Sequence, residues 1–262
     1  MTDFLTVAGL SLAAAAAVMV ATAYAASRTG RVSVVDVAWG LALVAVALVC
    51  ALLAGTWQSW LLVALVAVWG GRLSSHIFTR SRGHATEDPR YVELLGGHLS
   101  EVGMGVAVRK VFLLQGAAVW LVSLPLQAAA LSDTLDRPWL VWVGVAVWLV
   151  GVFFETVGDR QLAAYKADPD RGPVMDRGLW GWTRHPNYFG DSCVWWGIWI
   201  VGGLASGWVA GLASVIAPIT MTFWLVWVTG ARLLERSMMK RPGYPEYAAR
   251  TSMFVPLPPK KH

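Results

Sequence analysis

The sequence is poor in charged residues and in cysteine. Only 14% of its 262 residues are charged, whereas a soluble domain carries about 25%. Its two cysteines, Cys50 and Cys193, lie in separate apolar stretches, which offers neither a disulfide framework nor metal-ligand spacing. Phosphate-loop and Rossmann glycine motifs are also lacking. These absences exclude a disulfide scaffold and an ordinary soluble enzyme, and we predict no metal site.

Apolar residues dominate instead, at 56% of the chain with 16 Trp. A bilayer core about 30 Å thick needs roughly 20 apolar residues of helix. Uncharged runs of that length predict seven membrane helices in an all-α polytopic protein. They lie between residues 3 and 28, twice between 36 and 72 with a tight turn at Gly55-Thr56, over 111–132, over 138–154 and extendable toward 158, and twice between 191 and 232. We expect one membrane domain over 1–262, with substrate-side helices in 1–132 and cofactor-binding loops and tail in 138–262.

The positive charges indicate the orientation of these helices. With the N-terminus outside, every one of the 21 Lys and Arg except Arg137 falls on the inner side. Such a bias is typical of cytoplasmic segments. It predicts an N-out, C-in topology, and it accounts for the net charge of +5 without nucleic acid.

Ionisable and amide side chains gather at the predicted cytoplasmic helix ends. Charged groups there are costly and mark functional candidates, although snorkelling anchors and interfacial ion pairs are the simpler alternative. Several come in pairs four residues apart, which places them on one helix face. The group comprises Asp36, Arg72, His76, Glu155, Asp159, Asn187, Asp191, Arg232, Glu235 and Arg236. We expect these side chains to converge on a cup that opens to the cytoplasm.

The richest stretch is Gly-Leu-Trp-Gly-Trp-Thr-Arg-His-Pro-Asn-Tyr-Phe-Gly-Asp, at 178–191. Pro186 suits the first turn of a helix, and a helix N-terminus beside Arg177 and Arg184 favours an anion. His185 can donate a hydrogen bond or relay a proton. Tyr244 and Tyr247 follow in the tail, where they can cover a bound heterocycle or form an interfacial aromatic belt.

This block resembles the signature of the steroid 5α-reductase-like family, and more narrowly a bacterial branch of it. Residues 154–166 and the tail from Arg232 to Pro256 extend the resemblance. It implies a seven-helix membrane fold that binds NADPH from the cytoplasmic side, with Asn187 at the nicotinamide carboxamide and Asp191 behind it. Arg177 and Arg184 are added as phosphate partners by their charge alone. The expected cofactor-binding residues are Asp159, Lys166, Arg177, Arg184, His185, Asn187, Tyr188, Asp191, Arg232, Glu235, Tyr244 and Tyr247.

The steroid-reducing members hold the substrate ketone with a Glu and a Tyr on their second and third helices. We find no such pair here; Asp36, Arg72 and His76 lie at similar depths and are the expected catalytic residues. The resemblance implies a reductase of a C=C bond conjugated to a carbonyl in a hydrophobic, steroid- or lipid-like substrate. We expect it in the bacterial inner membrane, in contact with lipid, with its active site facing the cytoplasm.

Two other functions stay open. Isoprenylcysteine and phospholipid methyltransferases, which use S-adenosylmethionine, have a similar Arg-His-Pro block. The Asn-Tyr-Phe-Gly-Asp continuation and the pair of Asp159 and Lys166 favour the reductase. A non-catalytic transporter or assembly factor is the third alternative, and a transporter usually shows paired repeats and midplane polar groups.

Overall fold

The computed structural model describes residues 3–82, 86–228 and 230–259. Its regular structure over those ranges is helical and includes no strand, apart from an isolated bridge between Thr183 and Ser252. The all-α prediction is therefore confirmed. The chain forms two compact units, the first from 1–140 and 201–217, the second from 141–200 and 218–262.

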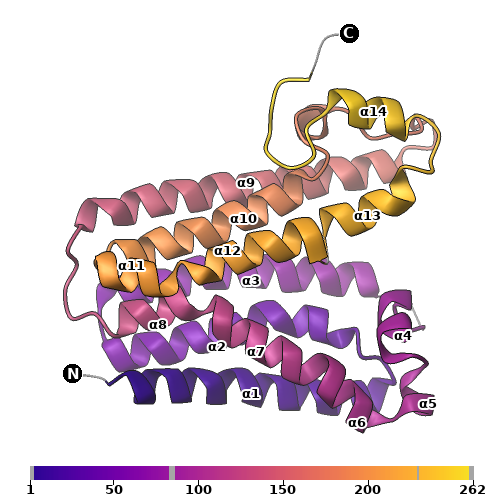
Figure 1. Cartoon of the computed structure of the whole chain (residues 1–262). Helices are drawn as coiled ribbons and strands as arrows, with labels where there is room; N and C mark the ends of the chain where they lie inside the picture. Colours follow the sequence, from indigo (N-terminus) through magenta and orange to yellow (C-terminus); the bar gives the residue numbers. More distant parts are fainter. Residues whose placement is uncertain (1–2, 83–85, 229, 260–262) are drawn as a thin grey trace. The chain divides into compact units, whose positions relative to one another are not determined.

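The first unit is built on three long helices, which Figure 1 shows side by side. Asp3 caps the first by accepting a hydrogen bond from the Thr6 amide at 2.8 Å. Gly55, with φ +67°, ends the second helix and Thr56 caps the third, which makes the predicted tight turn. The helices of this unit are α1 Phe4–Thr29, α2 Val34–Ala54, α3 Trp57–Ser81, α4 Pro89–Leu95, α5 Leu99–Val102, α6 Met104–Ala107, η1 Val108–Phe112, α7 Leu113–Val122, α8 Leu124–Ala130 and α11 Trp208–Ser214.

Helices α2 and α3 cross closely at two glycines. A Cβ added to Gly40 would lie 2.7 Å from the carbonyl oxygen of Gly70. Small residues of this kind let membrane helices approach backbone to backbone. One turn further along α3, the Ser74 hydroxyl donates to the Val37 carbonyl at 2.7 Å. The crossing therefore fixes the end of α2 that carries Asp36.

The segment after α3 carries a short helix, α4. Asp88 caps α4 by accepting from the Arg90 amide at 2.9 Å, Pro89 occupies its first turn, and Gly96 ends it with φ +85°. The Glu87 carboxylate accepts hydrogen bonds from the Val32 and Ser33 amides between α1 and α2. The polar segment is thus bound to the helix ends of its own unit.

The second unit comprises residues 141–200 and 218–262. Its elements are α9 Pro138–Ala167, η2 Gly178–Gly181, α10 Pro186–Trp199, η3 Ile200–Leu204, α12 Ile216–Phe223, η4 Trp224–Val228, α13 Ala231–Met238 and α14 Tyr244–Arg250, of which α9, η3 and α12 begin or end in the first unit. Helix α9 runs past the predicted apolar end near 158, so Asp159 and Lys166 belong to the same helix.

Glycines at every seventh position bring α9 and α10 together. A Cβ on Gly190 would lie 2.5 Å from the Gly151 carbonyl oxygen, and one on Gly197 would lie 2.7 Å from that of Gly144. At Gly158 the ring of Pro186 is the neighbour, at 3.2 Å. Because no side chain separates the two backbones here, the first turn of α10 is held against the end of α9.

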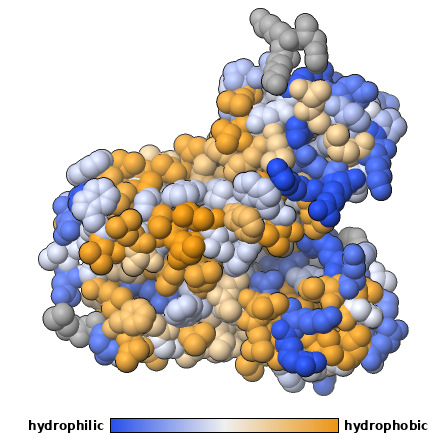
Figure 2. Space-filling model, in the orientation of Figure 1, coloured by the Kyte–Doolittle hydropathy of each residue, from blue (hydrophilic) through white to orange (hydrophobic). Residues whose placement is uncertain are grey.

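Six described helices are long and apolar enough to cross a membrane. They span 4–29, 34–54, 57–81, 104–122, 138–167 and 208–238. Large apolar side chains such as Val20, Leu52 and Leu212 are exposed on them, and Figure 2 shows hydrophobic residues over much of the helical surface. These helices are consistent with an integral membrane protein. The predicted sixth span coincides with α10, which has 14 residues and is followed by the five-residue η3.

The predicted span over 111–132 is not one continuous helix. A helical stretch runs from Met104 to Val122, and α8 starts after a turn at Ser123. Pro125 lies in the first turn of α8, where its missing N–H is tolerated, whereas inside a helix it would break the hydrogen-bond ladder. Apolar length alone therefore placed this helix too far toward the C-terminus.

Candidate functional site

Asn187 and Asp159 meet where α10 begins beside α9. The Asn187 amide nitrogen donates to Asp159 Oδ1 at 3.5 Å, and its Oδ1 accepts from the Tyr188 amide at 3.1 Å. Both side chains are only half-buried. The NH₂ group of Asn187 can donate twice, and among the described residues it has one acceptor, Asp159. Asp191 follows one turn later on α10 and is also half-buried.

Arg184 is held in a clamp rather than pointing at open solvent. Its guanidinium donates to both carboxylate oxygens of Glu235, at 2.6 and 3.0 Å, and to the carbonyls of Ala248 and Thr251, at 2.7 and 2.6 Å. Nε, Nη1 and Nη2 all have protein acceptors. The arginine thus connects the 178–191 block to α13 and to α14.

His185 and Tyr244 complete this cluster around Glu235. His185 Nε2 lies 3.1 Å from Glu235 Oε1, and the Tyr244 hydroxyl donates to the same oxygen at 3.4 Å. The His185 ring stacks on Tyr188 with centroids 5.5 Å apart. Burial and the neighbouring carboxylate raise the pKa of Tyr244, so its hydroxyl stays protonated at neutral pH. Burial opposes the charge on Arg184, but the Glu235 contacts outweigh it and leave the pKa of Arg184 raised.

The C-terminal tail lies along the start of the same block. The Arg184 amide donates to the Ser252 carbonyl at 2.9 Å, and the Leu257 amide donates to the Trp182 carbonyl at 3.0 Å. The Thr183 hydroxyl donates to the Phe254 carbonyl at 2.8 Å. Since backbone groups carry most of these contacts, the tail is positioned over the block independently of most of its side chains.

The turn before Arg184 is tied to α9. The Trp180 indole donates to the Gly158 carbonyl at 3.0 Å, and the Leu179 amide donates to Gln161 Oε1 at 3.0 Å. From α14, the Tyr247 hydroxyl donates to the Trp180 carbonyl at 2.5 Å. Burial raises the pKa of Tyr247, which keeps this donor protonated. Tyr247 is therefore buried in the unit rather than part of an exposed aromatic belt.

Other predicted cations of this unit remain on its surface. The side chains of Lys166 and Arg177 are exposed and make no hydrogen bond or ion pair with any residue that the structure describes. Arg232 is exposed on α13 and lies over the Trp227 ring at 5.6 Å. Lys166 and Arg177 are consequently available for an anionic ligand, unlike Arg184.

The three residues expected to be catalytic belong to the first unit. Asp36 accepts a hydrogen bond from the Tyr91 hydroxyl at 2.5 Å and pairs with Arg90 at 3.4 Å. Burial and the Asp36 carboxylate raise the pKa of Tyr91. Arg72 and His76 lie one turn apart on α3 and are half-buried. Asp36 therefore has a tyrosine partner, contributed by α4 rather than by a long helix.

The family follows from the sequence match over most of the chain. Residues 23–251 match the family model described as "Protein of unknown function (DUF1295)". The chain belongs to the DUF1295 family. It is also 34% identical over 74 residues to steroid 5-alpha-reductase DET2 of Arabidopsis thaliana, which covers 27% of this chain and 28% of the plant protein. Together these matches support the steroid 5α-reductase-like family that the 178–191 block predicts. No solved structure matches the chain.

Sequence reasoning missed Tyr91, Arg90 and Glu87. The sequence Asp88-Pro89, followed by Gly96, carries the capping signals of a short helix. Nothing in the sequence pairs Tyr91 with Asp36, which lies 55 residues earlier. That contact depends on how the segment after α3 folds back within its unit.

Proposed function

We propose that this protein is an NADPH-dependent membrane reductase of a C=C bond conjugated to a carbonyl in a hydrophobic substrate. Membership of DUF1295 and the similarity to a plant steroid 5-alpha-reductase support an oxidoreductase. The cofactor assignment rests on the position of the Asn187 side chain. Its half-buried carboxamide lies at the start of α10, where it donates to Asp159 and accepts from the Tyr188 amide.

The residues of the second unit fit a phosphorylated nicotinamide cofactor. A carboxamide such as Asn187 can pair with the nicotinamide amide, because each group has a donor and an acceptor. Lys166 and Arg177 are the cations for the phosphates, since neither is used inside the described protein. Arg184, His185, Glu235, Tyr244 and Tyr247 would position the block and tail around the ligand. Tyr188, Asp191 and Arg232 are the remaining residues of the proposed cofactor-binding site.

The chain's own residues would then stabilise the charge that develops on the substrate oxygen. When bound, NADPH supplies the hydride for the β-carbon of the conjugated system. We assign Arg72 and His76 as donors to the carbonyl oxygen, where a fixed donor stabilises the enolate. Water or a protonated side chain would supply the proton that the α-carbon of the enolate takes up, and Asp36, held by Tyr91, would position this end of α2.

We further propose seven spans with the N-terminus outside and the cofactor loops in the cytoplasm of a bacterial cell. This arrangement assigns α10 with η3 as the additional span. Almost all Lys and Arg would then face the cytoplasm, as the positive-inside rule favours. The soluble cofactor would enter from that side and the hydrophobic substrate from the lipid.

Cofactor binding by the detergent-solubilised protein tests the proposal. NADPH and S-adenosylmethionine are titrated separately, with energy transfer from the 16 Trp to reduced nicotinamide as one readout and calorimetry for both ligands. We expect saturable NADPH binding that Asn187→Ala removes and that Asp170→Ala, in an exposed loop, retains. Binding of S-adenosylmethionine alone would support the methyltransferase instead, which the comparisons do not favour. Binding of neither would support a non-catalytic protein.

A further inference from the structure

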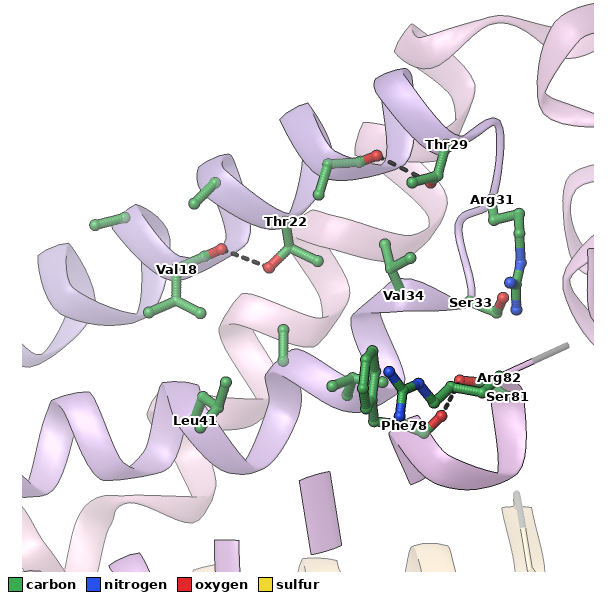
Figure 3. A pocket seen from close by; sticks show the side chains of 15 residues that line it. Val18, Thr22, Thr29, Arg31, Ser33, Val34, Leu41, Phe78, Ser81 and Arg82 are labelled. Carbon is green, nitrogen blue, oxygen red and sulfur yellow. Dashed lines mark hydrogen bonds between the residues drawn. The ribbon is translucent and has the colours of Figure 1, made fainter. Parts of the chain in front are cut away.

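The first unit contains an apolar groove of about 840 Å³ between α1, α2 and the end of α3 (Figure 3). Short side chains form its α1 wall, because Ala17, Ala21 and Ala25 recur every four residues and share one helix face. Val37 and Leu41 line the α2 wall. The two helices are in contact, so the groove is a property of this unit alone.

One end of the groove is polar and cationic. Arg31, Ser33, Ser81 and Arg82 gather there, whereas Val18 and Leu41 lie toward the other end (Figure 3). Arg82 lies over the Phe78 ring at 5.0 Å. The groove has no acidic side chain among its described lining residues. The Ser33 hydroxyl oxygen is buried and has no hydrogen-bond partner among the described residues.

We propose that this groove binds one anionic phospholipid of the surrounding membrane. Its apolar walls suit an acyl chain, and the exposed Arg82 guanidinium at its polar end suits a phosphate, which arginine binds through paired N–H donors. The Ser33 hydroxyl supplies a further donor for the same head group. A zwitterionic lipid would bring an ammonium group, for which the described lining offers no carboxylate. The nearby Glu87 carboxylate already accepts from the Val32 and Ser33 amides, so the groove favours net negative charge.

The place of the cationic end agrees with this ligand. In the proposed topology, the loop between α1 and α2 and the end of α3 face the cytoplasm. Basic pockets between membrane helices on that side recognise anionic head groups, because the inner leaflet is rich in them. The inference concerns lipid binding, and it stands whether or not the second unit binds NADPH.

Native mass spectrometry of the delipidated full chain tests the proposal. Phosphatidylglycerol and phosphatidylcholine with identical acyl chains are added back separately. We expect one tightly retained phosphatidylglycerol, with an affinity about tenfold above that for phosphatidylcholine. Arg82→Gln should remove this preference. Arg82 is the better choice than Arg31, because Arg31 takes part in another interaction within the protein.

Matched variants separate the groove from general lipid binding. Ala21→Trp, which fills the groove, should weaken both lipids, whereas Ala16→Trp, on an exposed position of α1 outside the lining, should not. Arg109→Gln, an exposed arginine outside the groove, should keep the preference. Equal affinities for the two lipids, or equal losses in the control variants, would overturn the proposal. If the Arg82→Gln variant does not fold, the lipid affinities of Ala21→Trp and Ala16→Trp still test whether the lipid binds in the groove.

Discussion

The two units use their charged side chains in different ways. In the second unit, Arg184 and Glu235 are 11% and 14% exposed, and the guanidinium donates only to protein acceptors. In the first unit, Asp36 is bound by Tyr91 and by Arg90, whose side chain is 56% exposed. Arg184 of the 178–191 block therefore stabilises the fold of its unit. In the proposed function, the phosphates of the cofactor are bound instead by Lys166 and Arg177, which are exposed.

Breaking the clamp of the second unit should have the largest effect. Glu235→Ala leaves the Arg184 charge largely buried without its carboxylate, which costs about 3–5 kcal/mol of unfolding free energy. The thermal midpoint in detergent should fall, and trypsin should cleave the tail after 250 faster. Asp176→Ala is the control, because its pair with Arg250 is solvent-exposed and should cost about 0–1 kcal/mol. Equal losses of unfolding free energy in the two variants would show that the Arg184–Glu235 pair does not act as a buried ion pair.

The hydrogen bond between Tyr91 and Asp36 in the first unit should contribute less to stability than the Arg184–Glu235 pair. Tyr91→Phe removes a hydrogen bond to a carboxylate, which contributes about 1.5–3 kcal/mol. We expect faster amide hydrogen exchange across α4, with little change in the second unit. Tyr24→Phe serves as control because that side chain is exposed on α1. Unchanged exchange across α4 would mean that the contact with Asp36 does not hold this helix.

The glycine crossing of α9 and α10 should also depend on close backbone contact. Gly190→Ala introduces a Cβ 2.5 Å from the Gly151 carbonyl oxygen, and overpacking of this kind costs about 1–3 kcal/mol. NADPH affinity should fall with stability, because Asn187 and Asp159 are held by the same crossing. Gly172→Ala is the matched control, since no atom lies within 4 Å of its added Cβ. Equal unfolding free energies for the two variants would show that α9 and α10 do not pack backbone to backbone at Gly190.

The positions of the long helices were more predictable from the sequence than the contacts between them. Uncharged length and the Gly55-Thr56 turn located the long helices, because both signals are local. The same reasoning ended α9 too early, since it treated Glu155 and Asp159 as the end of a span. In fact the helix continues for more than two turns beyond Asp159, through a mixture of polar and apolar residues. The spacing of Gly144, Gly151 and Gly158 was visible in the sequence and would have indicated a helix interface.

The candidate site was only partly predictable for the same reason. The spacing of Asn187 and Asp191 predicts a shared face of α10, but the approach of Asp159 depends on the glycine crossing. Charge alone made Arg177 and Arg184 equivalent phosphate partners. Their surroundings separate them, because Glu235 and two carbonyl groups from beyond α13 surround Arg184 only. Whether each binds phosphate stays a prediction.

That difference gives the prediction with the smallest effect on stability. Arg177→Ala and Lys166→Ala remove exposed side chains without described partners, so each should change the unfolding free energy by less than about 0.5 kcal/mol. Each should nevertheless lower NADPH affinity about tenfold, since a charge-assisted contact to phosphate is lost. Lys240→Ala, an exposed lysine outside the proposed set, should change neither quantity. If affinity stays constant while Arg184→Lys lowers it at unchanged thermal stability, then the buried arginine contacts the phosphates after all. The clamp around Glu235 would then have to open when the cofactor binds.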